Sequence, residues 1–229
     1  MFAGASKTQE KGQSLRFRWR IGWIIACPFV WLFPGLRVFG REKLVKGPQI
    51  LAVNHVSNID PLVVGCAAAR ELHFLAKEEL FRPSLFFAWL IRNFNAWPVR
   101  RGIADTGAIR HCSRILRYGQ SLVLFPEGTR SQTGEIGHFM RGVGMLAITN
   151  RVPVVPTFIQ GLDKSWISWF VDRDFVKKGF RKRSVHRTKI RVFFGEPVYP
   201  ENFSRDRRGY VEMTRAVEER VRTLGKCQG

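Results

Sequence analysis

Short apolar runs that lead into a polar motif and then into a helix constrain the fold of this chain more than any other feature. Ile50–Val53 predicts a buried strand, polar residues follow it, and Leu62–Ala69 predicts a helix. Further strands are expected at 72–76, 121–125, 151–158 and 188–194, and helices at 78–93, 104–118, 140–150 and 209–224. This alternation predicts an α/β fold, with a mixed, largely parallel sheet flanked by helices.

The polar motif after the first strand contains His55 and Asp60. A histidine can take and return a proton near neutral pH, and a neighbouring carboxylate can orient its ring. On a continuous helix, side chains five residues apart face different directions, so the pair can meet only if the chain bends. Pro61 favours such a bend and disfavours helical geometry at Asp60. The alternative is that Asp60 caps the N-terminus of the helix and His55 is an ordinary loop residue.

A second polar motif follows the strand at 121–125. Glu127, Gly128, Thr129 and Arg130 combine an acid, a flexible glycine, a hydroxyl group and a guanidinium group whose planar geometry suits phosphate. The alternative is an ordinary turn with a solvated arginine. Lys77 directly follows the strand at 72–76, at the position where ligands of open α/β sheets collect.

Two prolines also bear on the expected sheet. Pro153 and Pro156 lie in the strand at 151–158 and predict that it is an edge strand or an irregular one.

The charge balance indicates a polyanionic partner. The chain has 38 Lys plus Arg against 18 Asp plus Glu, a formal net charge of +20. Nucleic acid, an anionic membrane surface and an acidic protein or cofactor are all compatible with this charge. Seven tryptophans and nineteen phenylalanines, several of them beside basic residues, favour a membrane surface. No nucleic-acid-binding motif accompanies them, so no nucleic-acid partner is expected.

The amino-terminal region predicts a membrane anchor. Ile21 to Leu36 carries no charge, and arginines precede and follow it. Sixteen residues fall short of the ~20 of a spanning helix, and Pro28 and Pro34 disfavour a straight one. We therefore expect residues 1–40 to form a polar tail and an anchoring helical segment on the cytosolic face of the membrane, and residues 41–229 to form the α/β domain. A tilted spanning helix is the alternative. Residues 163–189 are expected to be a second membrane-contact element.

Four sequence blocks, taken together, resemble those of the glycerolipid acyltransferases, whose best-known members are the 1-acylglycerol-3-phosphate acyltransferases. The first two blocks are Asn54-His55-x-Ser57-x-x-Asp60 and residues 125–131. Residues 95–102 resemble the block whose arginine contacts the acceptor phosphate, and Arg101 matches that arginine. Residues 152–156 resemble the last, apolar block. The resemblance covers the chain from about residue 39 to residue 224.

The resemblance implies acyl transfer from a thioester to a hydroxyl group. His55 is then the general base and Asp60 orients it. Arg101 and Arg130 hold the acceptor phosphate, with Lys77 as a further candidate. Glu127 and Thr129, at the Gly128 bend, place the glycerol hydroxyl.

The same resemblance implies the substrates. The expected acceptor is the lysophospholipid 1-acylglycerol 3-phosphate, and the donor is acyl-CoA or acyl carrier protein. No bound cofactor and no metal are expected. Glycerol 3-phosphate or another lysophospholipid is the alternative acceptor. A non-catalytic basic protein that binds membranes or nucleic acid is the alternative class.

Overall fold

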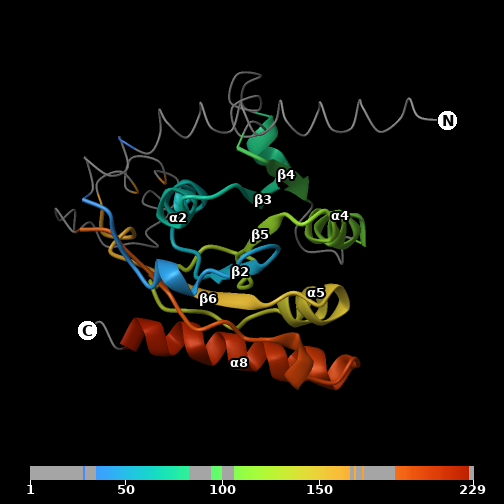
Figure 1. Ribbon diagram of the computed structural model, residues 1–229. Helices are drawn as coiled ribbons and strands as arrows, with labels where there is room; N and C mark the ends of the chain where they lie inside the picture. Colours follow the sequence, from blue (N-terminus) through green and yellow to red (C-terminus); the bar gives the residue numbers. More distant parts are fainter. Residues whose placement is uncertain are drawn as a thin grey trace.

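The computed structural model describes residues 28, 35–82, 94–99, 106–165, 168, 172 and 189–226. Within them, strands and helices alternate (Figure 1). The strands are β1 (Arg37–Phe39), β2 (Ile50–Val53), β3 (Leu72–Lys77), β4 (Ala96–Val99), β5 (Ser121–Leu124), β6 (Val154–Gln160) and β7 (Arg191–Phe194). The α-helices are α2 (Asp60–Ala68), α4 (Thr106–Arg117), α5 (Gly142–Asn150) and α8 (Arg207–Lys226). The 3₁₀ helices are η1 (Arg41–Lys43), η2 (Glu78–Phe81) and η3 (Pro200–Asn202).

The strands form one sheet in the order β1-β7-β6-β2-β5-β3-β4. The five strands from β6 to β4 are parallel to one another, β7 is antiparallel to β6, and β1 is parallel to β7. The predicted mixed, largely parallel sheet is therefore confirmed. β2 and β5 are buried along their whole length, as expected for parallel strands that are covered on both faces.

Successive residues of the central strands face two separate cores. Leu51 and Val53 belong to the core that includes α2, whereas Ile50 and Ala52 belong to the core that includes α4, α5 and α8. This alternation is the two-residue side-chain period of a strand. In Figure 1, α2 lies on one side of the sheet, and α5 and α8 lie on the other. Because helices cover both faces, the strand ends are left as the place for a polar site.

The contact between α5 and α8 depends on a glycine. A Cβ atom on Gly144 would lie 2.3 Å from the carbonyl oxygen of Tyr210 and 2.7 Å from Oγ1 of Thr214. The backbone N–H of Gly144 also donates to Thr214 Oγ1 at 3.2 Å. The missing side chain lets the two helices approach closely.

β6 lies inside the sheet, between β2 and β7, so the prediction of an edge or irregular strand is wrong. Pro153 precedes β6, and Pro156 pairs with Ala52 of β2. The carbonyl of Pro156 accepts the N–H of Gly195 at 2.8 Å, and Gly195 lies just past the end of β7. The N–H and C=O of one strand residue point to the same side. The backbone N–H that Pro156 lacks would therefore point toward Gly195, past the end of β7. Its absence removes no hydrogen bond between β6 and a residue of β7.

Several predictions fall mainly outside the described residues. Of the expected anchoring segment, only residues 28 and 35–40 are described, and residues 37–39 form the unexpected strand β1. In the part of the chain that the structure describes, no helix is long and apolar enough to cross a membrane. The stretch expected to be helical at 78–93 begins as η2, and residues 83–93 are not described. The anchor and the division at residue 40 stay predictions.

Candidate functional site

The two polar motifs lie side by side because β2 and β5 are adjacent and parallel. Ala52 of β2 pairs with Leu124 of β5. His55 and Glu127 each follow these paired residues by three positions. The backbone N–H of His55 donates to Glu127 Oε1 at 2.8 Å, and the N–H of Ser131 donates to the carbonyl of His55 at 2.7 Å. The parallel sheet thus brings two loops that are far apart in the sequence into direct contact.

His55 and Asp60 form a buried hydrogen-bonded pair. The distance from His55 Nδ1 to Asp60 Oδ2 is 2.7 Å, and the two residues are 5% and 0% exposed. The bend that the sequence predicts between them is therefore confirmed. Because Asp60 Oδ2 accepts the hydrogen bond of Nδ1–H, the ring keeps its proton on Nδ1, and the other ring nitrogen, Nε2, is left as the basic one. Phe125 stacks on the imidazole with a centroid separation of 4.3 Å.

Asp60 holds the loop as well as the ring. Its Oδ2 also accepts the N–H groups of Val56 at 2.7 Å and Ser57 at 2.9 Å. These donors precede α2, which begins at Asp60 itself, and the N-cap position is Ile59. The helix-cap alternative and the expectation of non-helical geometry at Asp60 are therefore wrong. Burial raises the pKa of Asp60, and hydrogen bonds, that of His55 first, oppose the rise.

Glu127 connects the loop that carries His55 to the segment that contains Gly137. Its Oε2 accepts the N–H of Gly137 at 2.9 Å, while Oε1 accepts that of His55. Burial raises the pKa of Glu127, and these two N–H groups oppose the rise. The two carboxylate oxygens of Glu127 thus hold the backbone at His55 and at Gly137 in place. The predicted role of Glu127 and of the exposed Thr129 at the glycerol hydroxyl stays a prediction.

The Gly128 turn needs a glycine. Gly128 has a φ of 72°, and its N–H donates to the carbonyl of Phe125 at 3.0 Å. A Cβ atom here would lie 2.4 Å from Cε of Met140. The turn sends the chain back toward the His55 loop, where Arg130 lies.

The predicted phosphate-binding residues have different surroundings. Arg130 is less than half exposed and forms an ion pair through Nη1 with Asp172 Oδ1. Lys77 lies at the end of β3, half exposed, with its Nζ 3.2 Å from Glu79 Oε1. Arg101 lies outside the described residues. The phosphate-binding roles of all three stay predictions.

Two residues make contacts that support the site and that the sequence did not predict, Asn54 and Asp172. Asn54 is buried, its amide donates to the carbonyl of Ile159 at 3.1 Å, and its Oδ1 accepts the N–H of Ile159 at 2.7 Å. It ties the end of β2 to β6, and its place in the motif beside His55 is the signal that could have found it. Asp172 lies in the basic segment expected to contact the membrane, where the sequence offers no comparable signal.

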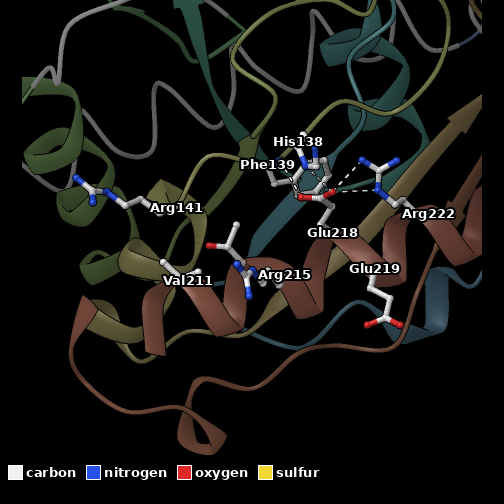
Figure 2. A pocket seen from close by; sticks show the side chains of 9 residues that line it. His138, Phe139, Arg141, Val211, Arg215, Glu218, Glu219 and Arg222 are labelled. Carbon is white, nitrogen blue, oxygen red and sulfur yellow. Dashed lines mark hydrogen bonds and ion pairs between the residues drawn. The ribbon is translucent and has the colours of Figure 1, made fainter. Parts of the chain in front are cut away.

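A surface hollow of about 500 Å³ lies elsewhere, between α8 and the segment 138–141 (Figure 2). None of the predicted site residues lines it. Within it, Glu218 of α8 accepts the N–H of Phe139 at 2.9 Å and pairs with Arg222, which also donates to the carbonyl of Gly137. These contacts hold the segment whose Gly137 binds Glu127, so α8 supports the site indirectly.

Comparisons with known proteins identify the family to which the chain belongs. A family model described as Acyltransferase matches residues 35–160, which include both motif loops. The 1-acyl-sn-glycerol-3-phosphate acyltransferase of Bacillus subtilis is 26% identical over 194 residues, 83% of this chain and 88% of that protein. A probable enzyme of the same name from Mycoplasma pneumoniae is 32% identical over 176 residues, 73% of this chain and 63% of that protein.

A solved structure shares the fold. The crystal structure of the 1-acyl-sn-glycerophosphate acyltransferase PlsC from Thermotoga maritima aligns with a TM-score of 0.66 and 26% identity, covering 98% of this chain and 85% of that one. The family model spans more than half of the chain and includes the buried His55–Asp60 pair. The chain therefore belongs to the acyltransferase family and is an acyltransferase.

Proposed function

We propose that this protein transfers a fatty acyl group from an acyl thioester to the free hydroxyl of 1-acylglycerol 3-phosphate and so forms phosphatidic acid. The observation that carries the proposal is the buried His55–Asp60 pair, which leaves Nε2 of His55 as the base. The names of the curated relatives and of the solved structure support the choice of acceptor.

In the proposed mechanism, His55 Nε2 takes the proton of the acceptor hydroxyl as its oxygen attacks the thioester carbonyl carbon. Asp60 stabilises the imidazolium that forms. The tetrahedral intermediate then collapses, the carbon–sulfur bond breaks, and the imidazolium returns the proton to the departing thiolate. The products are an ester and a free thiol. The serine and cysteine side chains of the described loops take no covalent part.

The acceptor phosphate is proposed to meet Arg130, with Arg101 and Lys77 as further contacts. Support for Arg130 comes from its position: its ion-pair partner Asp172 also binds Ser57 and Asn58, in the loop that carries His55. A guanidinium group offers a planar set of donors that matches phosphate oxygens.

The donor is proposed to be acyl-CoA or acyl carrier protein, and the enzyme to work on the cytosolic face of an anionic membrane. Both donors are acidic, and the net charge of +20 favours binding to either. A site open to the leaflet spares the acceptor's acyl chain from water, where each methylene costs ~0.8 kcal/mol. The segment 15–40 is the proposed anchor.

A thiol-release assay tests the reaction. Full-length protein in vesicles is given acyl-CoA or acyl carrier protein with 1-acylglycerol 3-phosphate, glycerol 3-phosphate or lysophosphatidylcholine. We expect thiol release with 1-acylglycerol 3-phosphate and its loss, by ~10²–10⁴-fold, in His55→Ala. His138→Ala is the matched control, because that side chain is 96% exposed and lines the separate hollow. Transfer to glycerol 3-phosphate alone would refute the acceptor, and normal turnover by folded His55→Ala would refute the mechanism.

Cysteine labelling tests the membrane arrangement. In a variant without the native cysteines, Ser6→Cys and Lys43→Cys should both react only with a reagent on the cytosolic side. Reaction of Ser6→Cys from outside would establish a spanning helix in place of an anchor within one leaflet.

A further inference from the structure

Asp172 is a buried carboxylate that accepts four hydrogen bonds. It is 2% exposed. Its Oδ1 pairs with Nη1 of Arg130 and accepts the N–H of Asn58 at 3.2 Å. Its Oδ2 accepts the hydroxyl groups of Ser57 at 2.5 Å and Ser168 at 3.0 Å. Burying a carboxylate costs free energy unless a positive group and hydrogen-bond donors replace the lost water, and here both are present.

These contacts join the two loops of the site through their side chains. The bonds from His55 to Glu127 and from Ser131 to His55 fix the backbones of the loops relative to each other. They do not by themselves fix the position of the long Arg130 side chain. Asp172 restricts that side chain, and it does so from the same carboxylate that binds Ser57, two residues after the base.

The ion pair with Asp172 also limits the orientation of the Arg130 guanidinium group relative to His55. A guanidinium group holds its donors in a rigid planar fork, so an ion pair through Nη1 restricts where the other donors can lie. Asp60 accepts the N–H of Ser57, and Asp172 accepts the hydroxyl of the same residue. One serine therefore links the carboxylate that orients the base to the carboxylate that orients the arginine.

We propose that Asp172 is a positioning residue, which holds the Arg130 guanidinium at a fixed place relative to His55 so that a bound acceptor phosphate presents its hydroxyl to Nε2. This rests on the proposed function, because it takes Arg130 as the phosphate-binding arginine. Asp172 itself touches neither the substrate nor the reacting atoms. Its effect passes through Arg130, and its bonds to Ser57 and Asn58 fix the carboxylate relative to the loop that carries His55.

The test is a set of kinetic measurements on Asp172→Asn, Arg130→Gln and the double variant. Asp172→Asn should lower kcat/KM for 1-acylglycerol 3-phosphate by up to ~100-fold, the scale of a misplaced reacting group, and leave the donor KM and the pH profile unchanged. In the Arg130→Gln background, Asp172→Asn should add less than about threefold, because its target is already gone.

Controls separate positioning from general destabilisation. Asp206→Ala removes an exposed carboxylate that accepts the N–H of Gly209 in the first turn of α8, so it should lower Tm without changing kcat/KM. If Asp172→Asn does not fold, Ser57→Ala replaces it. That variant removes one donor to the carboxylate, keeps the ion pair, and should lower acceptor kcat/KM by about two- to tenfold, with the donor KM unchanged.

Two outcomes would overturn the proposal. One is wild-type kinetics in folded Asp172→Asn, or in Ser57→Ala where it is needed. The other is full additivity of Asp172→Asn with Arg130→Gln. Failure of the proposed function is recognised separately, because the wild-type protein would then release no thiol with 1-acylglycerol 3-phosphate.

Discussion

Replacing Asp60 by asparagine tests the catalytic pair most sharply. Oδ2 of Asp60 accepts three N–H groups, from His55, Val56 and Ser57, while Oδ1 has no hydrogen-bond partner among the described residues. If the asparagine oxygen takes the position of Oδ2, the amide NH₂ group is left buried without an acceptor. If the amide is reversed, its NH₂ faces two backbone donors. Neither orientation reproduces the wild-type contacts.

The structure allows the size of the effect to be worked out. Three hydrogen bonds to a charged acceptor become bonds to a neutral one, at about 1 kcal/mol each, and the buried NH₂ adds about 1–3 kcal/mol. Relief from burying a charge offsets part of this loss, so we expect about 2–4 kcal/mol of lost stability. For a chain of this size that is roughly 5–15 °C in Tm. The rate should fall by ~10²–10⁴-fold, because the imidazolium loses its counterion.

Kinetic and thermal measurements on the same samples separate the two effects. Thiol release is followed well below Tm in Asp60→Asn, His55→Ala and the double variant. Asp60→Asn should cost the full rate factor in the wild-type background and almost nothing in the His55→Ala background. Its effect on Tm should persist in both backgrounds, and it should be smaller in the second by the missing bond to His55. A folded Asp60→Asn protein with near-normal kcat would refute the role of Asp60 as partner of the base.

Three further predictions concern stability. Gly128→Ala should lower Tm, because a φ of 72° costs a non-glycine residue about 1–2 kcal/mol and Met140 must move; an unchanged Tm would contradict the strain. Gly144→Ala should cost more than about 2 kcal/mol in denaturant unfolding, because the new methyl group meets the backbone of α8; a neutral result would show that the helices separate easily. Burial raises the pKa of Glu218, but the Phe139 N–H and Arg222 outweigh it, so its pKa is lowered overall. Its stabilisation is then present above pH ~4.5 and lost as pH falls through the folded pKa, and Glu218→Gln should flatten that part of the stability–pH curve.

Most of the sheet could be predicted because its strands are short apolar runs with clear ends. The runs at 50–53, 72–76 and 121–125 became β2, β3 and β5 within one residue at each end. β1 was missed because three residues next to an uncharged stretch carry no strand signal of their own, and pairing with β7 alone makes them a strand. The prediction for β6 was wrong because the cost of a proline depends on whether the neighbouring strand offers an acceptor for the missing N–H. A single sequence does not show which residue of the neighbouring strand lies there.

Contacts of the site between residues close in the sequence could be predicted, and contacts between distant residues could not. His55 and Asp60 are five residues apart, so a bend and a proline sufficed to predict that they meet. The contact between Ser57 and Asp172 spans 115 residues, and Asp172 belongs to a basic segment with no repeating pattern. In the sequence it stands next to Arg173 and Asp174, a pattern typical of an ordinary surface segment. Only the folded chain shows that it is buried and opposite Arg130.

The sheet register explains why each motif must keep its distance from its own strand. Ala52 and Leu124 are paired, and each motif places its key residue three positions further, so that the N–H of His55 meets the carboxylate of Glu127. A slip of one residue between β2 and β5 would turn every β2 side chain to the other face and separate this pair. The loops that join the elements between the two motifs can vary in length without this effect, because they only have to connect one element to the next. The short spacing from strand to motif is therefore the part of the sequence that the chemistry constrains.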